Sequence, residues 1–415
     1  MSDFFYQCVN CGKEYPAGGI QYLCPSCESG NIPDASPKGV LKTVYDYNKL
    51  RKDVAPGELF KNLSQNGFLD LLPVNSLESF GPLKVGNTPA YHWQQKSRNG
   101  THQLILKDDS HNPTFSFKDR ASALVSAFAK ENHIHTIVAA STGNAGSSLA
   151  GICASQGQKA VIFVPATAPK AKLLQIMLYG ATIVPVAGNY DAAFDSSLQA
   201  TKEYGLYNRN TAYNPLTIEG KKTAAFELFG QCGMQAPDVI FVSVGDGVIL
   251  SGIYKGFEDL LMLGIIEKMP RIVAVQAEGS NSIIRNLHSE VFKPSSAQTI
   301  ADSISVVIPR NFYMAKDFLL KYNGEGIAVT DDAILNASLK LTRNFGIFTE
   351  PAGAAAFAGY LKYCETNSPE NDSKIAVLLT GSGLKDLNAV SSLVTLPEAI
   401  EPSKEALRKI SVLIH

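Results

Sequence analysis

The chain has 415 residues, of which 45% are apolar and 18% charged, and its formal net charge at pH 7 is −1. These values are typical of a globular enzyme with two or three domains. A charge so close to zero argues against a nucleic-acid partner, which needs a basic face. No apolar run reaches the roughly 18 residues that span a bilayer. Residues 1–7 show no secretory signal, so we expect a cytoplasmic protein.

Four of the seven cysteines form two Cys-x2-Cys pairs close to the amino terminus. Cys8 and Cys11 make the first pair, and Cys24 and Cys27 make the second, twelve residues further on. This spacing is typical of a zinc ribbon, in which four thiolates hold one tetrahedral ion. The alternatives are a ribbon that has lost its metal and two disulfides, which the cytosol disfavours. We predict a structural zinc ribbon over residues 1–34 and a linker over residues 29–38, which supply Gly, Pro, Ser and Asn.

Lys118 lies at a predicted turn from a strand to a helix. Residues 103–106 are typical of a buried strand, and residues 121–129 have apolar positions at helical spacing. A lysine in a partly apolar setting loses the solvation of its ammonium form, so its pKa falls and its free amine can attack an aldehyde. From this segment alone, an exposed lysine in the first turn of a helix is the alternative.

Three more predicted strands end in loops of glycines and polar residues. Residues 136–140 precede the Ser141–Gly146 loop, residues 239–244 precede Gly245–Gly247, and residues 374–379 precede Thr380–Asp386. Helices follow the first two loops over residues 147–156 and about 250–263. Backbone N–H groups at a glycine turn that opens a helix bind phosphate readily. One lysine and three polar strand ends therefore predict a site for a phosphorylated aldehyde cofactor.

The alternation of strands and helices after Leu104 predicts a doubly wound α/β architecture with parallel strands. Within it, Asn112–Arg120 resembles the lysine motif of the threonine synthases, which are pyridoxal-phosphate enzymes of the tryptophan-synthase β type, fold type II. The resemblance covers nearly all of the chain after about Pro82. It continues in order through residues 141–144, 179–181, 219–223, 275–279, 299–302, 350–353 and 380–386.

This resemblance implies two doubly wound α/β lobes with pyridoxal 5'-phosphate between them, and a homodimer. The large lobe is expected over residues 35–131 and 220–415, and the small lobe over residues 132–219. The implied reaction converts O-phospho-L-homoserine and water to L-threonine and phosphate by γ-elimination and β-addition.

The resemblance also implies a role for each site residue. Lys118 is expected to hold the cofactor as an imine and to remove the α-proton, Asn144 to bond the ring hydroxyl, and Thr380 to face the pyridine nitrogen. Ser141 and Thr142 are expected to bind the substrate carboxylate. The cofactor phosphate is expected among Gly245, Asp246, Gly247, Val248 and Ile249. The candidates for the substrate phosphate are Lys107, Ser116, Arg120 and Lys170.

Structural roles are the alternatives for several of these residues. Helix capping or turn formation is the alternative for Asn144, Ser141, Thr142 and Thr380. We expect Lys385 and Asp386 to form a solvated pair. Glu350 and Asp302 are expected to shape the interface between the lobes, without a chemical role.

Two positions depart from the family pattern and keep other functions open. Phe115 replaces the usual glycine before Ser-Phe-Lys, and the phosphate loop reads Gly-Asp-Gly-Val-Ile in place of Gly-Asn-x-Gly-Asn. One alternative is therefore a related enzyme that eliminates from serine, threonine or diaminopropionate, or that adds a sulfur nucleophile at the β-carbon. A catalytically silent interaction protein that binds through its ribbon is the second alternative.

Overall fold

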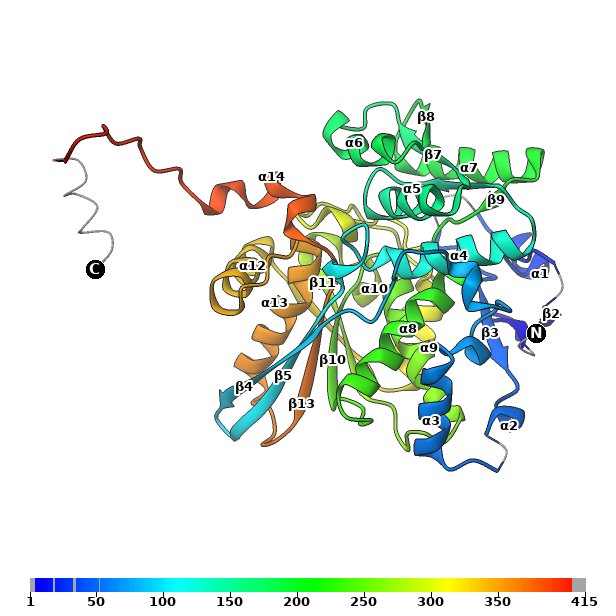
Figure 1. Cartoon of the computed structure of the whole chain (residues 1–415), viewed down its shortest axis with the longest axis horizontal. Coiled ribbons are helices and arrows are strands. Elements are labelled where there is room, and N and C mark those ends of the chain that lie inside the picture. Colours follow the sequence, from blue (N-terminus) through cyan, green and yellow to red (C-terminus); the bar gives the residue numbers. More distant parts are fainter. Residues whose placement is uncertain (1–3, 18, 33–34, 52, 405–415) are drawn as a thin grey trace.

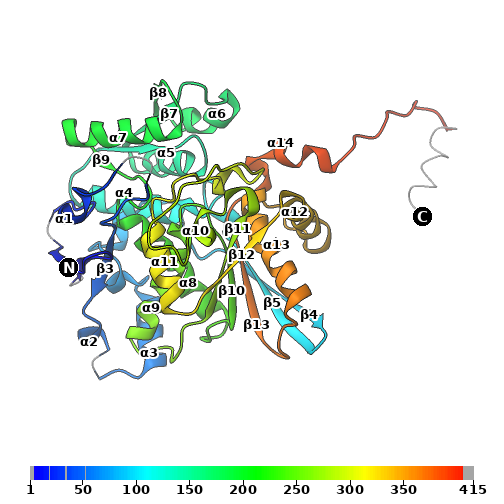
Figure 2. The same ribbon diagram turned by 180° about the vertical axis from the view of Figure 1, so that it is seen from behind.

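The computed structural model of the chain describes residues 4–17, 19–32, 35–51 and 53–404, and their strands form three sheets (Figures 1 and 2). Within the predicted ribbon, residues 1–3, 18, 33 and 34 lie outside the described residues. The small amino-terminal sheet is antiparallel and has the order β2-β1-β3. Its strands are β1 (Phe4–Cys8), β2 (Glu14–Pro16) and β3 (Leu41–Tyr45).

Short helices accompany the amino-terminal sheet. They are α1 (Pro25–Glu28), α2 (Tyr47–Leu50) and α3 (Pro56–Gln65). Because β3 pairs with β1 over its whole length, the ribbon sheet includes residues as far along the chain as Tyr45.

The largest sheet has six strands in the order β12-β11-β10-β13-β5-β4. Its strands are β4 (Ala90–Ser97), β5 (Gly100–Asp108), β10 (Val239–Ser243), β11 (Arg271–Ala277), β12 (Glu325–Val329) and β13 (Lys374–Leu379). All neighbours are parallel except the edge strand β4, which is antiparallel to β5. The two-residue connection between β4 and β5 permits only an antiparallel pair.

Helices cover both faces of the six-stranded sheet, as a doubly wound fold requires. Successive residues of β10 point to opposite sides: Ile240 packs with one group of helices, whereas Phe241 packs with the other. The first group contains α8 (Leu216–Gln231), α9 (Val248–Met262) and α11 (Phe312–Lys321). The second contains α12 (Asp331–Phe345) and α13 (Pro351–Thr366). Burial on both faces explains why the central strands β10 and β13 are mostly apolar.

The third sheet is parallel and has the order β8-β7-β6-β9. Its strands are β6 (Thr136–Ala140), β7 (Lys159–Pro165), β8 (Thr182–Val186) and β9 (Tyr207–Asn208). The accompanying helices are α4 (Lys118–Glu131), α5 (Asn144–Gln156), α6 (Lys170–Leu178) and α7 (Tyr190–Tyr204). In Figure 1, α4 runs between this sheet and the helices α8 and α9.

A buried network of ions and tyrosines joins the ribbon sheet to the large sheet's helices. Tyr45 on β3 donates a hydrogen bond of 2.7 Å to Glu219 on α8. Lys222 bonds to Glu219 at 2.5 Å and to Asp259 on α9 at 2.7 Å, and Lys255 also pairs with Asp259. Because each of these buried charges has an opposite partner close by, the network tolerates burial.

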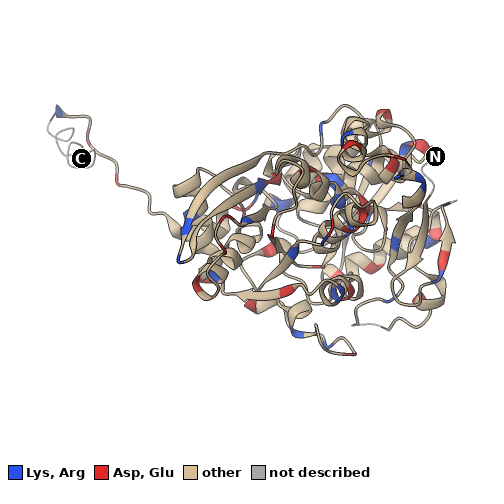
Figure 3. Ribbon diagram, turned by 90° about the horizontal axis from the view of Figure 1, so that it is seen from below, with Lys and Arg blue, Asp and Glu red and all other residues tan. Residues whose placement is uncertain are grey.

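The remaining elements are two short helices and a carboxyl-terminal segment. The helices are α10 (Ser282–Arg285) and α14 (Leu387–Val390), and the segment after α14 runs away from the rest of the fold in Figure 1. Within the described ranges, no helix is long and apolar enough to cross a membrane. Basic and acidic residues are mixed along the elements in the view of Figure 3.

Candidate active site

The loop that carries Lys118 is bound to the loop that follows β13. The backbone N–H of Phe117 donates to the Thr380 carbonyl at 2.9 Å, and that of Ser382 donates to the Phe115 carbonyl at 3.0 Å. Lys118 is the first residue of α4, so these bonds fix the start of that helix beside the carboxyl end of β13. The predicted turn from strand to helix at Lys118 is therefore confirmed, and Thr380 lies next to it.

Lys118 combines a half-buried position with an amine that is available for chemistry. Burial lowers the pKa of Lys118, while the nearby Glu350 carboxylate acts in the opposite direction and the Arg209 guanidinium lowers it further. Its Nζ makes no hydrogen bond or ion pair with any other residue that the structure describes. A larger share of this amine is therefore uncharged at neutral pH than for an exposed lysine.

Asn144 connects the four-stranded sheet to the six-stranded sheet. It begins α5, and its Nδ2 donates to both carboxylate oxygens of Glu350 at 2.8 and 3.0 Å and to Ser303 Oγ at 3.1 Å. Burial raises the pKa of Glu350, and the neighbouring Lys118 acts in the opposite direction. Glu350 thus bonds Asn144 and acts electrostatically on Lys118. Glu350 was expected only to shape the interface between the lobes, and the sequence signal at this position is the Glu-Pro pair that opens α13.

A cleft of about 540 Å³ opens beside these residues. Thr142, Asn144 and Glu350 line it, and so does Phe115. Ser141 is part of the same loop, and its Oγ accepts a hydrogen bond of 3.2 Å from the Gly143 N–H. Ser116 is completely buried, and its Oγ has no hydrogen-bond partner among the described residues.

Contacts between the two sheet units also border this cleft. Lys172 on α6 pairs with Asp302 at 2.8 Å, which agrees with the interface role expected for Asp302. The expectation that Lys385 forms a solvated pair with Asp386 is wrong. The Lys385 amine instead donates to Gln175 at 2.7 Å, to Ser147 at 3.0 Å and to the Thr114 carbonyl at 3.2 Å.

Residues 245–249 include the turn after β10 and the first two residues of α9. A Cβ atom at Gly245 would lie 2.9 Å from the Ile304 Cα, and one at Gly247 would lie 2.9 Å from the Ala315 Cβ. Gly247 also has φ of 89°, a conformation that favours glycine, and it caps α9. Two glycines are thus required for the turn, and the first N–H groups of α9 lack partners within the helix. Burial raises the pKa of Asp246 in this loop, although Lys221 and Arg310 oppose the shift.

The three cations proposed for the substrate phosphate lie elsewhere. Lys107 bonds to Glu227 at 2.7 Å, and Arg120 bonds to Glu227 and to Asp109 at 2.6 Å each. Lys170 is exposed at the start of α6. None of the three lines the cleft that contains Asn144.

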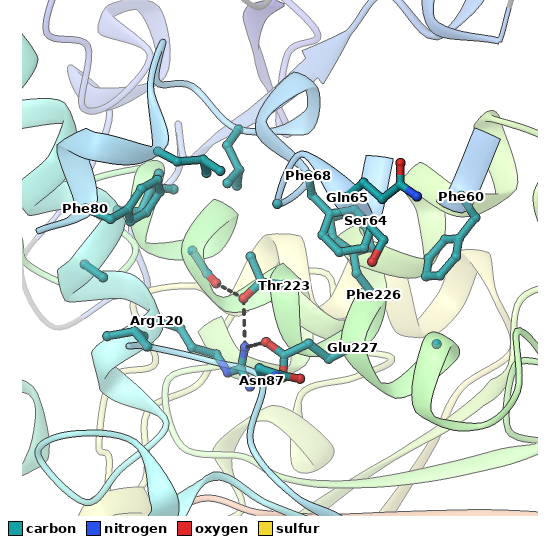
Figure 4. Close-up of a pocket in the computed structure, with 18 of the residues that line it drawn as sticks. Phe60, Ser64, Gln65, Phe68, Phe80, Asn87, Arg120, Thr223, Phe226 and Glu227 are labelled. Carbon is teal, nitrogen blue, oxygen red and sulfur yellow. Dashed lines mark hydrogen bonds and ion pairs between the residues drawn. The ribbon is translucent and has the colours of Figure 1, made fainter. Parts of the chain in front are cut away.

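Arg120 instead faces a second cavity, of about 750 Å³, on the other side of α4. Figure 4 shows Arg120 bonded to Thr223 and Glu227, with phenylalanine side chains along the rest of the wall. Arg120, Thr223 and Glu227 bond to one another, whereas Ser64, Gln65 and Asn87 also line the second cavity.

The four amino-terminal cysteines converge as the spacing predicts. Cys8, Cys11, Cys24 and Cys27 place their sulfur atoms within 4.8 Å of one another, and all four are free thiols. The Cys8–Cys27 and Cys11–Cys24 sulfur distances are 3.8 and 3.6 Å. A tetrahedral zinc ion with Zn–S bonds of about 2.3 Å needs sulfurs about 3.8 Å apart. The arrangement therefore fits such an ion.

The residues around Lys118 fit a group that carries both an aldehyde and a phosphate. The lysine offers an amine of lowered pKa, the Gly245–Ile249 loop offers a backbone turn at a helix amino terminus, and Asn144 offers an amide. A pyridoxal-phosphate cofactor has these two groups on one ring.

Comparisons with known proteins agree with this chemistry. Residues 82–381 match the family model described as pyridoxal-phosphate dependent enzyme. A threonine synthase of Methanocaldococcus jannaschii is 35% identical over 97% of this chain and 98% of its own length. A threonine synthase of Methanosarcina acetivorans is 30% identical over 98% of both chains.

Solved structures share the fold. The processed form of threonine deaminase isoform 2 from Solanum lycopersicum has a TM-score of 0.63 at 21% identity, covering 91% of this chain and 98% of that chain. Maize serine racemase has a TM-score of 0.61 at 21% identity, and the match covers 80% of this chain and 94% of the racemase chain. The chain therefore belongs to the family of pyridoxal-phosphate-dependent enzymes and, within it, to the threonine synthases.

Proposed function

We propose that the protein converts O-phospho-L-homoserine and water to L-threonine and phosphate. One observation carries the proposal: Lys118 begins α4 beside the Thr380 loop, burial lowers the pKa of its amine, and the Glu350 carboxylate that Asn144 bonds acts on that amine. The threonine synthase relatives, which match almost the whole chain, support the same reaction.

Pyridoxal phosphate, when bound, supplies an aldehyde that joins an amine and a ring that accepts electrons from the bonds being broken. Lys118 would hold it and then carry the proton removed from the substrate's α-carbon. Asn144, fixed by Glu350, would bond the ring hydroxyl. Thr380 would offer the ring nitrogen a hydroxyl in place of a carboxylate, so that nitrogen would not need to be protonated.

The substrate carboxylate would lie at the loop of Ser141 and Thr142, which leads into α5. This helix has 13 residues, and the positive end of its dipole favours an anion there. Ser147 in the first turn of α5 is bonded by Lys385, which holds the loop against the large sheet. The substrate then loses its α-proton, a β-proton and the γ-phosphate. It regains a proton at the γ-carbon, and water then adds with its hydroxyl at the β-carbon.

The reaction is tested by incubating the purified protein and pyridoxal phosphate with O-phospho-L-homoserine. We expect equal amounts of phosphate and L-threonine, and no product from Lys118→Ala, because this variant lacks the amine proposed to hold the cofactor and to carry the α-proton. Lys130→Ala, at the far end of the same helix, is the control. Ammonia released from serine or threonine, without phosphate release from O-phospho-L-homoserine, would favour the related elimination enzymes instead.

Phe115 allows a second test, because its backbone has φ of 69° and its ring is 48% exposed at the cleft. Phe115→Ala removes the ring and keeps a Cβ, whereas Phe115→Gly removes both. We expect Phe115→Gly to be more stable than Phe115→Ala by about 1 kcal/mol, since glycine adopts positive φ without strain.

Chemical denaturation of the two Phe115 variants measures this difference. A change in KM that both variants share would report the ring's contact with the substrate. Equal stabilities would show that the turn carries no strain.

We propose that Cys8, Cys11, Cys24 and Cys27 hold one structural zinc ion. Metal analysis of the full chain should find about one zinc per chain, and Cys11→Ser should lose it. Ser26→Ala, which removes the hydroxyl of a residue between Cys24 and Cys27, should retain the metal. A full chain with intact thiols and no bound zinc, even after it is supplied, would refute the site.

We also propose that the enzyme is a cytoplasmic homodimer that acts on a small molecule, without a nucleic-acid or membrane partner. The net charge of −1 and the mixed charges in Figure 3 support the absence of a nucleic-acid partner. Sedimentation velocity tests the dimer, and a monomer at working concentration would contradict it.

A further inference from the structure

The amino-terminal ribbon contacts the four-stranded sheet as well as the helices of the six-stranded sheet. On one side, Tyr45 bonds to Glu219 on α8, which packs on the six-stranded sheet. On the other side, Tyr22 reaches β9 of the four-stranded sheet, and its hydroxyl accepts a hydrogen bond of 2.8 Å from the Asn208 N–H. Figures 1 and 2 show the ribbon helix α1 beside β9. The ribbon therefore touches both units that border the cleft.

Tyr22 packs against both ends of residues 207–213, which include β9 and most of the connection to α8. Its ring is nearly parallel to the Tyr213 ring, with the centroids 4.5 Å apart and an angle of 17° between the planes. The centroid of the Tyr207 ring lies 6.2 Å from that of Tyr22, at an angle of 31°. Aromatic rings at such separations attract one another. One ribbon side chain thus holds the two ends of this segment together.

Residues 207–213 also contact the proposed active site. Arg209 is 1% exposed, and its guanidinium donates to the Lys118 carbonyl at 3.5 Å and to a serine hydroxyl one turn further along α4 at 3.2 Å. The Asn210 side-chain oxygen accepts a bond of 2.7 Å from the Ala140 N–H, at the end of β6. The loop proposed to bind the substrate carboxylate begins at the next residue. The segment therefore fixes the start of α4 and the strand end that leads into this loop.

The backbone of this segment includes an unfavourable conformation. Ala212 has φ of 62°, in the left-handed region that a residue with a Cβ atom seldom adopts. Such a conformation persists only where the surrounding contacts enforce it, and it is found most often at functional segments. Ala212 is buried, and its N–H donates to Thr217 Oγ1 at 3.3 Å. The stacking of Tyr22 on the adjacent Tyr213 is a further contact that restrains this turn.

Tyr22 belongs to the part of the ribbon that the second cysteine pair organises. Leu23, the next residue, forms an antiparallel bridge with Val40. Cys24 follows, and its N–H donates to the Gly39 carbonyl at 2.8 Å. A metal held by the four sulfurs would fix this turn, because small ribbons depend on their metal for folding. We therefore expect the position of Tyr22 to depend on whether the ribbon holds zinc.

We propose that Tyr22 is a positioning residue through which the metal state of the ribbon controls the proposed active site. With zinc bound, Tyr22 holds residues 207–213 and keeps Arg209 beside the start of α4. Without zinc, Tyr22 is released, and the Arg209 guanidinium moves away from Lys118. The inference rests on the proposed zinc site and on the proposed role of Lys118, and it adds a coupling between the ribbon and the cleft.

The test measures how labelling of Lys118 by pyridoxal depends on pH in the full chain freed of cofactor, after borohydride reduction and peptide mapping. The charged groups that act on Lys118 or that it acts on are Glu350, Arg209, Asp246, Lys221 and Lys385. Burial lowers the pKa of Lys118 most, and the like charge of Arg209 lowers it further. Loss of Arg209 from this position therefore raises that pKa and moves the labelling curve to higher pH.

Tyr22→Ala should move the labelling curve of Lys118 to higher pH, although the chain keeps about one zinc. Tyr22→Phe retains the ring and removes only the acceptor for the Asn208 N–H, so a smaller shift in the same direction is expected. Cys11→Ser, which should lose the zinc, is expected to shift the curve as Tyr22→Ala does. Tyr204→Ala, at a tyrosine that is 73% exposed at the end of α7, is the control and should leave the curve unchanged.

The combined variant Cys11→Ser, Tyr22→Ala shows whether the two changes act along one route. If they do, the combined shift should not exceed the larger single shift, whereas independent effects would add. Circular dichroism establishes that each variant is folded, and Tyr22→Phe decides the question if Tyr22→Ala does not fold or does not keep its zinc.

A labelling curve of Tyr22→Phe that coincides with that of the unchanged chain would overturn the proposal. A shift in the Tyr22 variants without one in Cys11→Ser would overturn the part assigned to the metal. If the protein forms no threonine from O-phospho-L-homoserine, but the curve still shifts in all these variants, the coupling stands and the proposed reaction fails.

Discussion

The site depends on the backbone hydrogen bonds that tie Phe115 and Phe117 to the loop after β13. Helix α4 packs its apolar side chains into the core of the four-stranded sheet, yet these bonds fix its first residue to the six-stranded sheet. Lys118 is therefore positioned by both units at once. The Asn144–Glu350 bonds join the same two units a short way along the cleft. A buried amine can stay in place here because its helix cannot move independently of either sheet.

Helix α8 carries two neighbouring buried lysines, of which one pairs with carboxylates and the other does not. Lys222 pairs with Glu219 and Asp259 and so helps to hold the ribbon sheet against the large sheet. Lys221, one residue earlier, points about 100° away around the helix and has no carboxylate partner among the described residues. One helix thus links the ribbon to the region around Lys118.

Much of the fold could be predicted because buried parallel strands leave a strong apolar pattern. The strands at residues 136–140 and 374–379 have the predicted bounds. Strand β3 could not be predicted, since its partner β1 is remote in sequence. The antiparallel β4–β5 pair was missed although Asn99-Gly100 is a hairpin signal. The turn at Lys118 could be predicted because its signal lies in neighbouring residues. Lys107 and Arg120 instead pair with Glu227, more than 100 residues away in the sequence. Lys385 bonds to Gln175 in the other sheet unit, which local sequence does not reveal.

The central claim is that burial at this junction gives Lys118 an amine of lowered pKa. It is tested most directly by treating the cofactor-free full chain with pyridoxal at a series of pH values, followed by borohydride reduction and peptide mapping. We predict that labelling of Lys118 rises with pH and levels off at a lower pH than the labelling of exposed lysines, because burial lowers its pKa below the ordinary 10.5. Labelling of Lys118 that rises only near that value, in parallel with exposed lysines such as Lys130, would contradict the account.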